Sequence, residues 1–322
     1  MTGPNRRQSL ALLGAVLALP PAGAASPPLL GIMNFGAPPA EGGPPDAMPA
    51  QLARLGLQDG VHLRYQLRYA RGQRERFDEL LNDLLRREVD LIHAAGSDIT
   101  RVLLAKAPRV PVVFIASDDP VESGLVRSLA QPGGWLTGMT MMSPQLGGKR
   151  LETLKLIVPG LRRVAVMYDR YHAFYLEQMK APAAVLGLEL EPLGFEDAGD
   201  FAGVFARARR AGAEAMFVAP NRYTLVFASR IAELSVQQRM PAISAYDSFA
   251  RAGGLLSYGP VQADALVRAA EQIARVLHGE HPSRLPVEQL SRIVLIANQK
   301  TARAMGVSLP AAILARADEV IE

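Results

Sequence analysis

The sequence predicts an α/β protein with two doubly wound, parallel-sheet lobes that are joined by three crossover segments. Short apolar strands alternate with amphipathic helices in two successive blocks, which is the pattern of parallel sheets covered on both faces. The chain has 322 residues, which is enough for two domains. Segments rich in Pro and Gly separate the blocks and indicate where the chain passes from one lobe to the other.

The first block contains four expected strands with helices between them. The strands are expected at residues 29–33, 61–67, 89–93 and 110–115. The helices are expected at residues 48–57, 74–86 and 99–106. In the helix at 74–86 apolar residues recur every three or four positions, so one face of it should be buried.

The second block repeats the alternation. Its strands are expected at residues 163–168, 188–193, 215–219 and 242–245. Its helices are expected at residues 146–157, 172–187, 200–211 and 223–238, with a final helix at 309–317. Each block therefore predicts one doubly wound lobe.

Three Pro/Gly-rich or irregular segments divide the chain, at residues 131–138, 253–259 and 285–294. We expect residues 28–138 plus 259–285 to form the first lobe. Residues 139–258 plus 286–322 should form the second. Two lobes connected in this way are expected to move as a hinge.

The first 25 residues read as a signal peptide. Arg6 and Arg7 precede a ten-residue apolar run, and Ala22 and Ala24 offer small residues at a cleavage site. The run is about half the length needed to cross a bilayer, and the alternative reading is a buried core helix. The arginine pair resembles a twin-arginine signal, but Ser9 stands where that motif usually has Phe, so the export route stays open.

The composition argues against several classes of protein. Lys and Arg total 35 and Asp and Glu total 31, and this small excess does not indicate nucleic-acid binding. The absence of cysteine removes disulfides, thiol chemistry, Cys-ligated metals and a lipid-anchor cysteine. No apolar stretch after the leader reaches membrane-spanning length, so we do not expect a membrane-embedded protein.

The sequence also lacks a motif for catalysis, metal or cofactor. The five histidines have no metal-ligand spacing. Ser97 follows an expected strand without a nearby histidine to activate it, and the adjacent Asp118 and Asp119 should point in opposite directions. The Gly-rich turns match neither a P-loop nor a dinucleotide-binding fingerprint. We therefore expect a binding protein without metal or cofactor, not an enzyme.

A long motif connects the chain with a known family. Residues 119–138 read DPVESGLVRSLAQPGGWLTG, which resembles the GDPV..GLV.SLA.PGGN.TG pattern of the substrate-binding proteins of ABC transporters. Similar segments follow at residues 148–155, 158–166, 253–260, 285–289 and 309–321. The family has a type I periplasmic-binding fold, and its relatives include tryptophan- and tyrosine-binding importer components.

The resemblance implies that ligand contacts come from loops at the carboxyl ends of strands in both lobes. These loops are residues 34–36, 95–100 and 116–118 in the first lobe and 169–171, 220–223 and 246–247 in the second, and within them we single out thirteen residues. In the first lobe these are Asn34, Phe35, Gly96, Ser97, Thr100, Ser117 and Asp118. In the second lobe they are Asp169, Tyr171, Asn221, Tyr223, Tyr246 and Asp247.

The residue types suggest roles for these contacts. Ser97 and Thr100, beside a helix N-terminus, would hold a carboxylate, and Asp247 or Asp169 would hold an ammonium group. Phe35 and the tyrosines would surround an apolar side chain. Ordinary packing is the alternative for each aromatic residue, and a helix cap is the alternative for Asp247.

The chain departs from the family pattern at the expected cleft. Residues 95–100 read AGSDIT in place of an AGTPAA-type loop, which puts the acid Asp98 beside the expected carboxylate position. Residues 168–172 read YDRYH in place of a WNPxNP-like segment, and the Pro/Gly-rich loop at 38–49 replaces the usual start of the first helix. The ligand therefore does not carry over from the relatives.

The resemblance implies an extracytoplasmic solute-binding protein that closes on a small metabolite, an amino acid or a related small acid. Its partners would be the permease and ATPase of a cognate importer, and we expect a monomer in the periplasm. A sensory or accessory binding protein of the same fold is the alternative. An exported α/β enzyme is disfavoured because the sequence offers no catalytic group.

Overall fold

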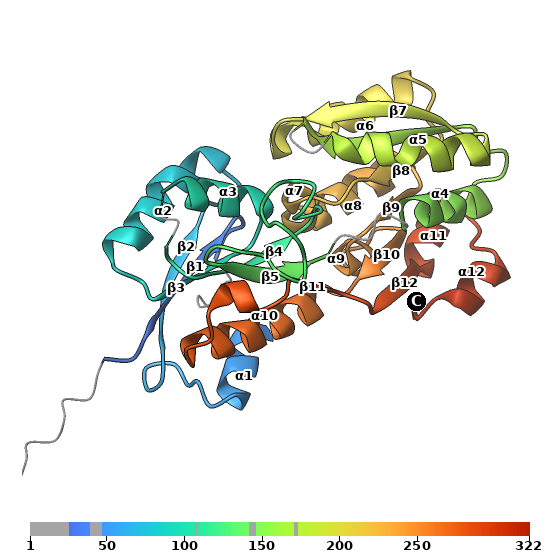
Figure 1. The fold of residues 1–322 in the computed structure, drawn as a ribbon. Helices are drawn as coiled ribbons and strands as arrows, with labels where there is room; N and C mark the ends of the chain where they lie inside the picture. Colours follow the sequence, from blue (N-terminus) through green and yellow to red (C-terminus); the bar gives the residue numbers. More distant parts are fainter. Residues whose placement is uncertain (1–25, 39–46, 107–108, 142–145, 171–172) are drawn as a thin grey trace, which may run out of the picture.

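The computed structural model describes residues 26–38, 47–106, 109–141, 146–170 and 173–322 (Figure 1). The predicted signal peptide at 1–25 and the predicted site residue Tyr171 lie outside these ranges. So do residues 39–46 of the Pro/Gly-rich loop.

The first lobe is built on a six-stranded sheet with the order β11-β5-β4-β3-β1-β2. Its strands are β1 (Leu29–Asn34), β2 (Arg64–Tyr69), β3 (Leu91–Ala94), β4 (Val112–Ala116), β5 (Leu136–Thr140) and β11 (Glu288–Gln289). All neighbouring strands are parallel. The carboxyl ends of these strands therefore meet at one edge, where open α/β sheets bind ligands.

Helices cover both faces of this sheet (Figure 1). On one face lie α2 (Phe77–Arg86), which follows the short 3-10 turn η1 (Arg74–Arg76), and α3 (Ser97–Lys106). On the other lie α1 (Ala47–Arg54) and α10 (Gln262–Leu277), which pack against each other. The four apolar residues that α2 buries have the spacing expected of one helix face.

The second lobe is built on a seven-stranded sheet with the order β13-β12-β10-β9-β8-β6-β7. Its strands are β6 (Arg163–Asp169), β7 (Glu189–Phe195), β8 (Ala215–Val218), β9 (Ala242–Ser244), β10 (Leu256–Pro260), β12 (Ile293–Asn298) and β13 (Glu319–Ile321). The strands are parallel to their neighbours except for the antiparallel pair β10 and β12.

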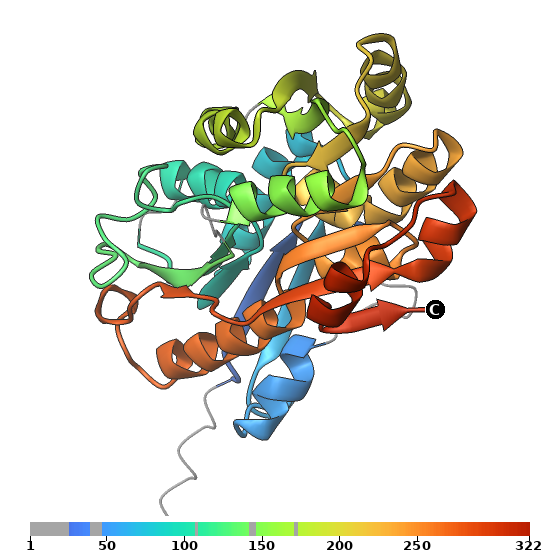
Figure 2. The ribbon, with the colours of Figure 1, turned by 90° about the vertical axis from the view of Figure 1, so that its right-hand side faces the viewer.

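The helices of the second lobe surround its sheet (Figure 2). They are α4 (Leu146–Ile157), α5 (Phe174–Leu186), α6 (Phe201–Arg210), α7 (Arg222–Val226), α8 (Ala228–Gln237), α9 (Asp247–Arg251), α11 (Gln299–Met305) and α12 (Ala311–Arg316). Two further 3-10 turns are η3 (Ala198–Asp200) and η4 (Pro282–Arg284), the second of which follows α10. The single helix expected at 223–238 is two helices, because Phe227 leaves the helical conformation between them.

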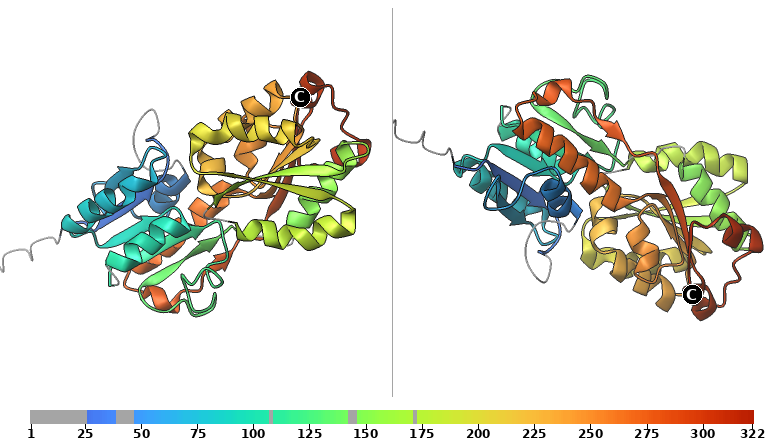
Figure 3. Two further views of the ribbon diagram at one scale, coloured as in Figure 1. Left: turned by 90° about the horizontal axis from the view of Figure 1, so that it is seen from above. Right: turned by 90° about the horizontal axis from the view of Figure 1, so that it is seen from below.

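The chain passes between the sheets three times, after β5, after β10 and between β11 and β12. Figure 3 shows the two lobes side by side with these connections between them. The predicted fold class, two α/β lobes with three crossovers, is therefore confirmed. We propose lobe boundaries that follow sheet membership, with residues 26–140 and 261–290 in the first lobe. This places β5 and β11 with the first sheet and β10 with the second.

Candidate functional site

A cavity of about 190 Å³ lies between the two lobes. The first lobe contributes the loops after β1, β3 and β4 together with one end of α10, and the second lobe contributes α7 and Tyr246. Five predicted site residues line it: Asn34, Phe35, Gly96, Ser117 and Tyr246. Its position at the carboxyl ends of the strands of the first sheet matches the expected site.

Most of the cavity wall is apolar. Gly36, Ala95 and Arg222 line the cavity from loops where contacts were expected. The lining residues outside the expected loops are Ile115, Met141, Leu225, Val226, Gln262, Ala265 and Leu266. Apolar walls with a few polar groups are typical of sites for small organic ligands.

Arg222 is the cationic side chain that lines this cavity in the described part of the protein. It begins α7, in the second lobe, and is only 7% exposed. Its guanidinium forms an ion pair with Asp98, in α3 of the first lobe. Arg74 lies on the same carboxylate, with its Nη2 2.8 Å from Asp98 Oδ2. A cluster of two cations and one anion therefore spans the cleft, with Arg222 and Asp98 buried and Arg74 partly exposed.

Two aromatic rings of the first lobe hold the Arg222 side chain. Its guanidinium carbon lies 4.7 Å from the centre of the Phe35 ring and 5.0 Å from the centre of the Phe77 ring. Such contacts stabilise a cation, and more so when it is removed from water. Arg222 of the second lobe thus packs between Phe35, Phe77 and Asp98 of the first lobe.

Gly96 allows this packing. Its φ is 147°, a conformation that residues with a side chain rarely adopt. A Cβ atom here would lie 3.1 Å from Arg222 Nη1 and 3.2 Å from Asp98 Oδ1. A glycine is therefore required both by the backbone and by the space that the ion pair fills.

The position of Arg222 disfavours the charged form of its side chain. Burial is the main reason that its pKa is held well below the usual value, and repulsion by Arg74 is the second reason. Arginine nevertheless remains protonated in proteins. An added anion next to Arg222 would therefore be stabilised strongly.

The predicted carboxylate-binding pair, Ser97 and Thr100, does not face the cavity. The Ser97 hydroxyl donates to Asp118, and the Thr100 hydroxyl donates to the Gly96 carbonyl at 2.8 Å. Asp118 in turn accepts from Arg101 at 3.0 Å. Asp98 itself accepts the main-chain N–H of Ile99, so an acid of the chain already occupies part of the helix N-terminus where the ligand carboxylate was expected.

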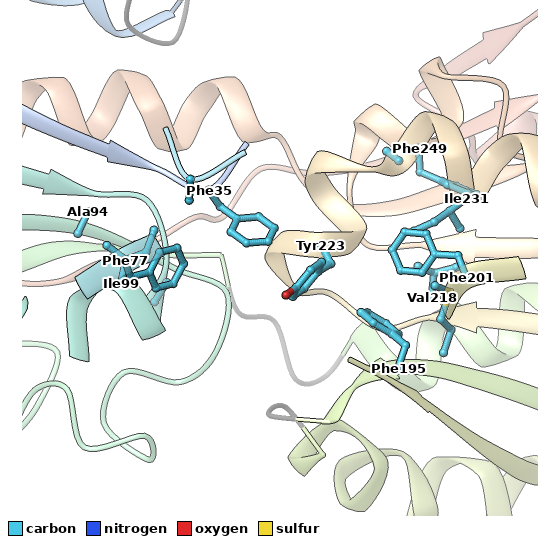
Figure 4. Close-up of a cluster of buried hydrophobic side chains, with 14 of the residues drawn as sticks. Phe35, Phe77, Ala94, Ile99, Phe195, Phe201, Val218, Tyr223, Ile231 and Phe249 are labelled. Carbon is cyan, nitrogen blue, oxygen red and sulfur yellow. The ribbon is translucent and has the colours of Figure 1, made fainter. Parts of the chain in front are cut away.

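A row of aromatic rings connects the lobes (Figure 4). The Phe35 ring lies 4.6 Å from the Tyr223 ring, and Tyr223 lies 5.7 Å from Phe195, centre to centre. Tyr223 is buried in this row. It therefore closes the interface against Phe35 and does not line the cavity in this structure.

Three other predicted residues of the second lobe, Asn221, Asp247 and Asp169, do not line the cavity. Asn221 caps α7, since its side chain accepts the N–H of Thr224 at 3.0 Å. Asp247 is the first residue of α9 and lies 3.5 Å from the guanidinium of Arg251, while Tyr246 is the N-cap residue and no side chain of the described residues caps the helix. Asp169 is fully buried at the end of β6 and does not line the cavity.

Tyr246 and Ser117 join the lobes at the rear of the cavity. Burial raises the pKa of Tyr246, so its hydroxyl stays neutral, and Ser117 hydrogen-bonds to it. The main-chain carbonyl of Ser117 accepts a hydrogen bond from Tyr175, a residue of α5 in the second lobe. Tyr246, Ser117 and Tyr175 therefore meet at this corner, where the charge of the buried Arg150 acts on both tyrosines.

Arg222 lies within the expected ligand loop at residues 220–223, but the sequence reasoning gave it no role and named only its neighbours Asn221 and Tyr223 as site residues. Among the described residues no three acidic or histidine side chains come together as metal ligands. None of the helices in the described ranges has the length and hydropathy that a bilayer-spanning segment requires.

The fold and the interlobe cavity define a two-lobed α/β binding protein of the type I periplasmic class. Residues 46–321 match the family described as ABC transporter substrate binding protein, so the chain belongs to this family. Members of this family are extracytoplasmic substrate-binding proteins that bind small molecules and work with ABC transporters. They are not enzymes.

Individual relatives agree with this assignment. A protein named Tyrosine-binding protein, from Clostridioides difficile, is 21% identical over 254 residues, which cover 78% of this chain and 72% of that protein. A domain from Streptococcus pneumonia, solved in complex with L-Trp, has a TM-score of 0.81 at 22% identity, over 92% of this chain and 100% of that one. A conserved domain protein from Vibrio cholerae has a TM-score of 0.82 at 23% identity, over 91% and 99%. At these identities the structures establish the fold.

Proposed function

We propose that this chain is the solute-binding component of an ABC importer and that its lobes close on a small organic acid, an amino acid or a related compound. The buried Arg222 on a mostly apolar interlobe cavity carries this proposal. A guanidinium group that is removed from water favours binding of a carboxylate. The apolar wall favours a ligand whose remaining part is aliphatic or aromatic.

The relatives support the same class of ligand. The printed names of two of them include tyrosine and L-Trp, each of which combines a carboxylate with an aromatic side chain. We propose that Asn34, Phe35, Gly96, Ser117, Tyr246 and Arg222 form the ligand site. The remaining predicted residues, Ser97, Thr100, Asp118, Asp169, Asn221, Tyr223 and Asp247, would position these groups.

We further propose that the protein acts in the periplasm as a monomer and delivers its ligand to a cognate permease and ATPase. The family assignment and the predicted signal peptide support this location.

A thermal-shift screen of amino acids and related organic acids tests the binding function. A ligand that binds the folded state stabilises it by about 2.7 kcal/mol at 100 times its dissociation constant. We expect at least one small acid to raise the melting temperature in a saturable way. Deletion of the gene should then reduce uptake of that acid by the cell. The proposal is wrong if no compound in a broad metabolite library shifts the transition.

A further inference from the structure

We propose that the interlobe cavity selects organic monocarboxylates that lack an ammonium group, with the carboxylate held by Arg222 and Asn34. This inference rests on the proposed function and specifies its ligand. It differs from simple transfer of an amino-acid ligand from the relatives, because free amino acids would be disfavoured.

Unsatisfied hydrogen-bond donors provide the first argument. The Nε of Arg222 and the Nδ2 of Asn34 are buried, and neither has a hydrogen-bond partner among the described residues. Both residues line the cavity, Asn34 from the end of β1 and Arg222 from the start of α7. A buried donor without a partner is costly. A carboxylate supplies two acceptor oxygens and a negative charge, so a ligand carboxylate that reaches Arg222 and Asn34 would give both donors an acceptor.

The charges around the cavity provide the second argument. Arg222 and Arg74 both pair with the carboxylate of Asp98, so two guanidinium groups meet at one acid beside the cavity. Arg150 is a further buried cation, and its charge acts on Tyr246 of the cavity wall. Its Nε donates to the Tyr258 carbonyl at 2.7 Å, and no ion pair joins it to an acid in the described part of the chain. The buried guanidinium groups of Arg222 and Arg150 would attract an anionic ligand.

An ammonium group would find no counter-charge. No carboxylate lines the cavity among the described residues. Asp98 is held by Arg222 and Arg74, Asp118 by Arg101, and Asp247 lies beside Arg251. Asp169 does not line the cavity, and its charge contributes to raising the pKa of Tyr223, which does not line it either. An ammonium group on the carbon next to the carboxylate would therefore be buried close to Arg222 without a partner, which is unfavourable.

Matched ligands test this selectivity directly. Titration calorimetry of the purified protein should compare desaminotyrosine, tyrosine and tyramine, and likewise indolepropionate, tryptophan and tryptamine. We expect the acid without an amine to bind at least about tenfold tighter than the amino acid, as the cost of an unpaired buried group predicts. The two amines should not bind.

Variants then assign the selectivity to the ion cluster. Arg222→Gln should weaken binding of the acid by at least about thirtyfold, since it removes one partner of a buried charged pair. Arg222→Lys should restore part of the affinity. Arg230→Gln, which changes an exposed arginine of α8 paired with Glu233, is the matched control and should bind normally. Circular dichroism establishes that each variant is folded.

Asp98→Asn separates ligand selection from a purely structural ion pair. Removing the competing carboxylate leaves the size of the side chain unchanged, so the acid should bind several times tighter. A structural role of the pair alone predicts weaker binding of every ligand.

The outcomes are distinguishable. If tyrosine or tryptophan binds more tightly than its matched acid, the selectivity is overturned while the binding function stands. If Asp98→Asn binds the ligand acid less tightly than the parent protein does, the assignment of the ligand carboxylate to Arg222 is overturned. The same holds if no acid of either series binds. A wide library without any ligand would contradict the proposed function itself.

Discussion

At the scale of single residues, His93 predicts how stability depends on pH. It lies fully buried in β3, and its Nδ1 donates to the Val113 carbonyl at 3.0 Å. Burial lowers its pKa from 6.5 to about 4. The unfolded chain therefore takes up a proton below pH 6.5 while the folded protein does not, so stability falls between about pH 6.5 and 4. The contribution that is lost is about 3 kcal/mol at most.

The variant His93→Gln, which keeps a donor but does not titrate, should flatten this part of the profile. Urea unfolding between pH 4 and pH 7 measures the effect. His278→Gln changes an exposed histidine and should keep the pH dependence of the parent. An equal slope in the parent and in His93→Gln would show that His93 titrates normally.

The same scale shows where the sequence stopped being informative about the site. Asn34, Phe35, Gly96, Ser117 and Tyr246 lie at or just after the carboxyl ends of strands, where the family resemblance placed ligand contacts. An arginine in the first turn of a short helix gives no such signal, because most charged helix residues are solvated. The partner of Arg222 is Asp98 of the other lobe, and no local pattern connects two residues so far apart in the chain.

At the scale of elements, Gly138 determines how closely β5 approaches β4. It pairs with Phe114 in the sheet, and a Cβ atom at residue 138 would lie 2.2 Å from the Phe114 carbonyl oxygen. Neither strand can move apart to make room without breaking the hydrogen bonds between β4 and β5. Gly138→Ala should therefore destabilise the protein by about 1–3 kcal/mol or more, as overpacked cores do.

Urea unfolding measures this cost against Gly203→Ala in α6. There the nearest atom to an added Cβ is Arg207 Nη1 at 3.5 Å, which belongs to a flexible side chain. That change should stabilise the helix by up to about 1 kcal/mol. Two alanine variants of equal stability would contradict the close approach of the strands.

Gly and Pro also explain which elements the sequence did not reveal. Residues 131–138 and 253–259 read as turns, yet they contain the start of β5 and most of β10. The strands form there because Leu136, Leu255 and Leu256 are buried between the helical layers. Tertiary burial thus outweighs local turn propensity. The strands with continuous apolar runs, such as β4 and β6, could be predicted from the sequence because nothing local competes with burial.

At the scale of the whole molecule, the sequence predicts two lobes and three crossings but not how the lobes meet. The contacts that join them across the cleft include Arg222 with Asp98, Tyr223 with Phe35, and Tyr175 with the Ser117 carbonyl. The lobes are thus closed on each other in this structure. Each contact depends on the relative position of two independently folded sheets, which periodicity and motifs do not encode.

Ligand-driven closure is the property that a receptor of this architecture requires. The Gly72 backbone, in the first lobe, contacts the Phe227 ring of the second, since an added Cβ would lie 2.7 Å from it. Gln73 and Ser229 are exposed residues beside this contact, one on each lobe. Because the chain has no cysteine, Gln73→Cys and Ser229→Cys provide two unique positions for spin labels.

We expect the doubly labelled protein without ligand to give a broad distribution of distances between the labels. A saturating organic acid should shift the distribution to shorter distances and narrow it, because the bound anion stabilises the closed state over the open one. Pulsed electron resonance measures both quantities, and a pair of labels within one lobe should not respond. In Arg222→Gln the shift should disappear at the same ligand concentration. An unchanged distribution despite ligand-induced thermal stabilisation would mean that the ligand binds to lobes already closed, so that Arg222 would select the ligand without driving any movement.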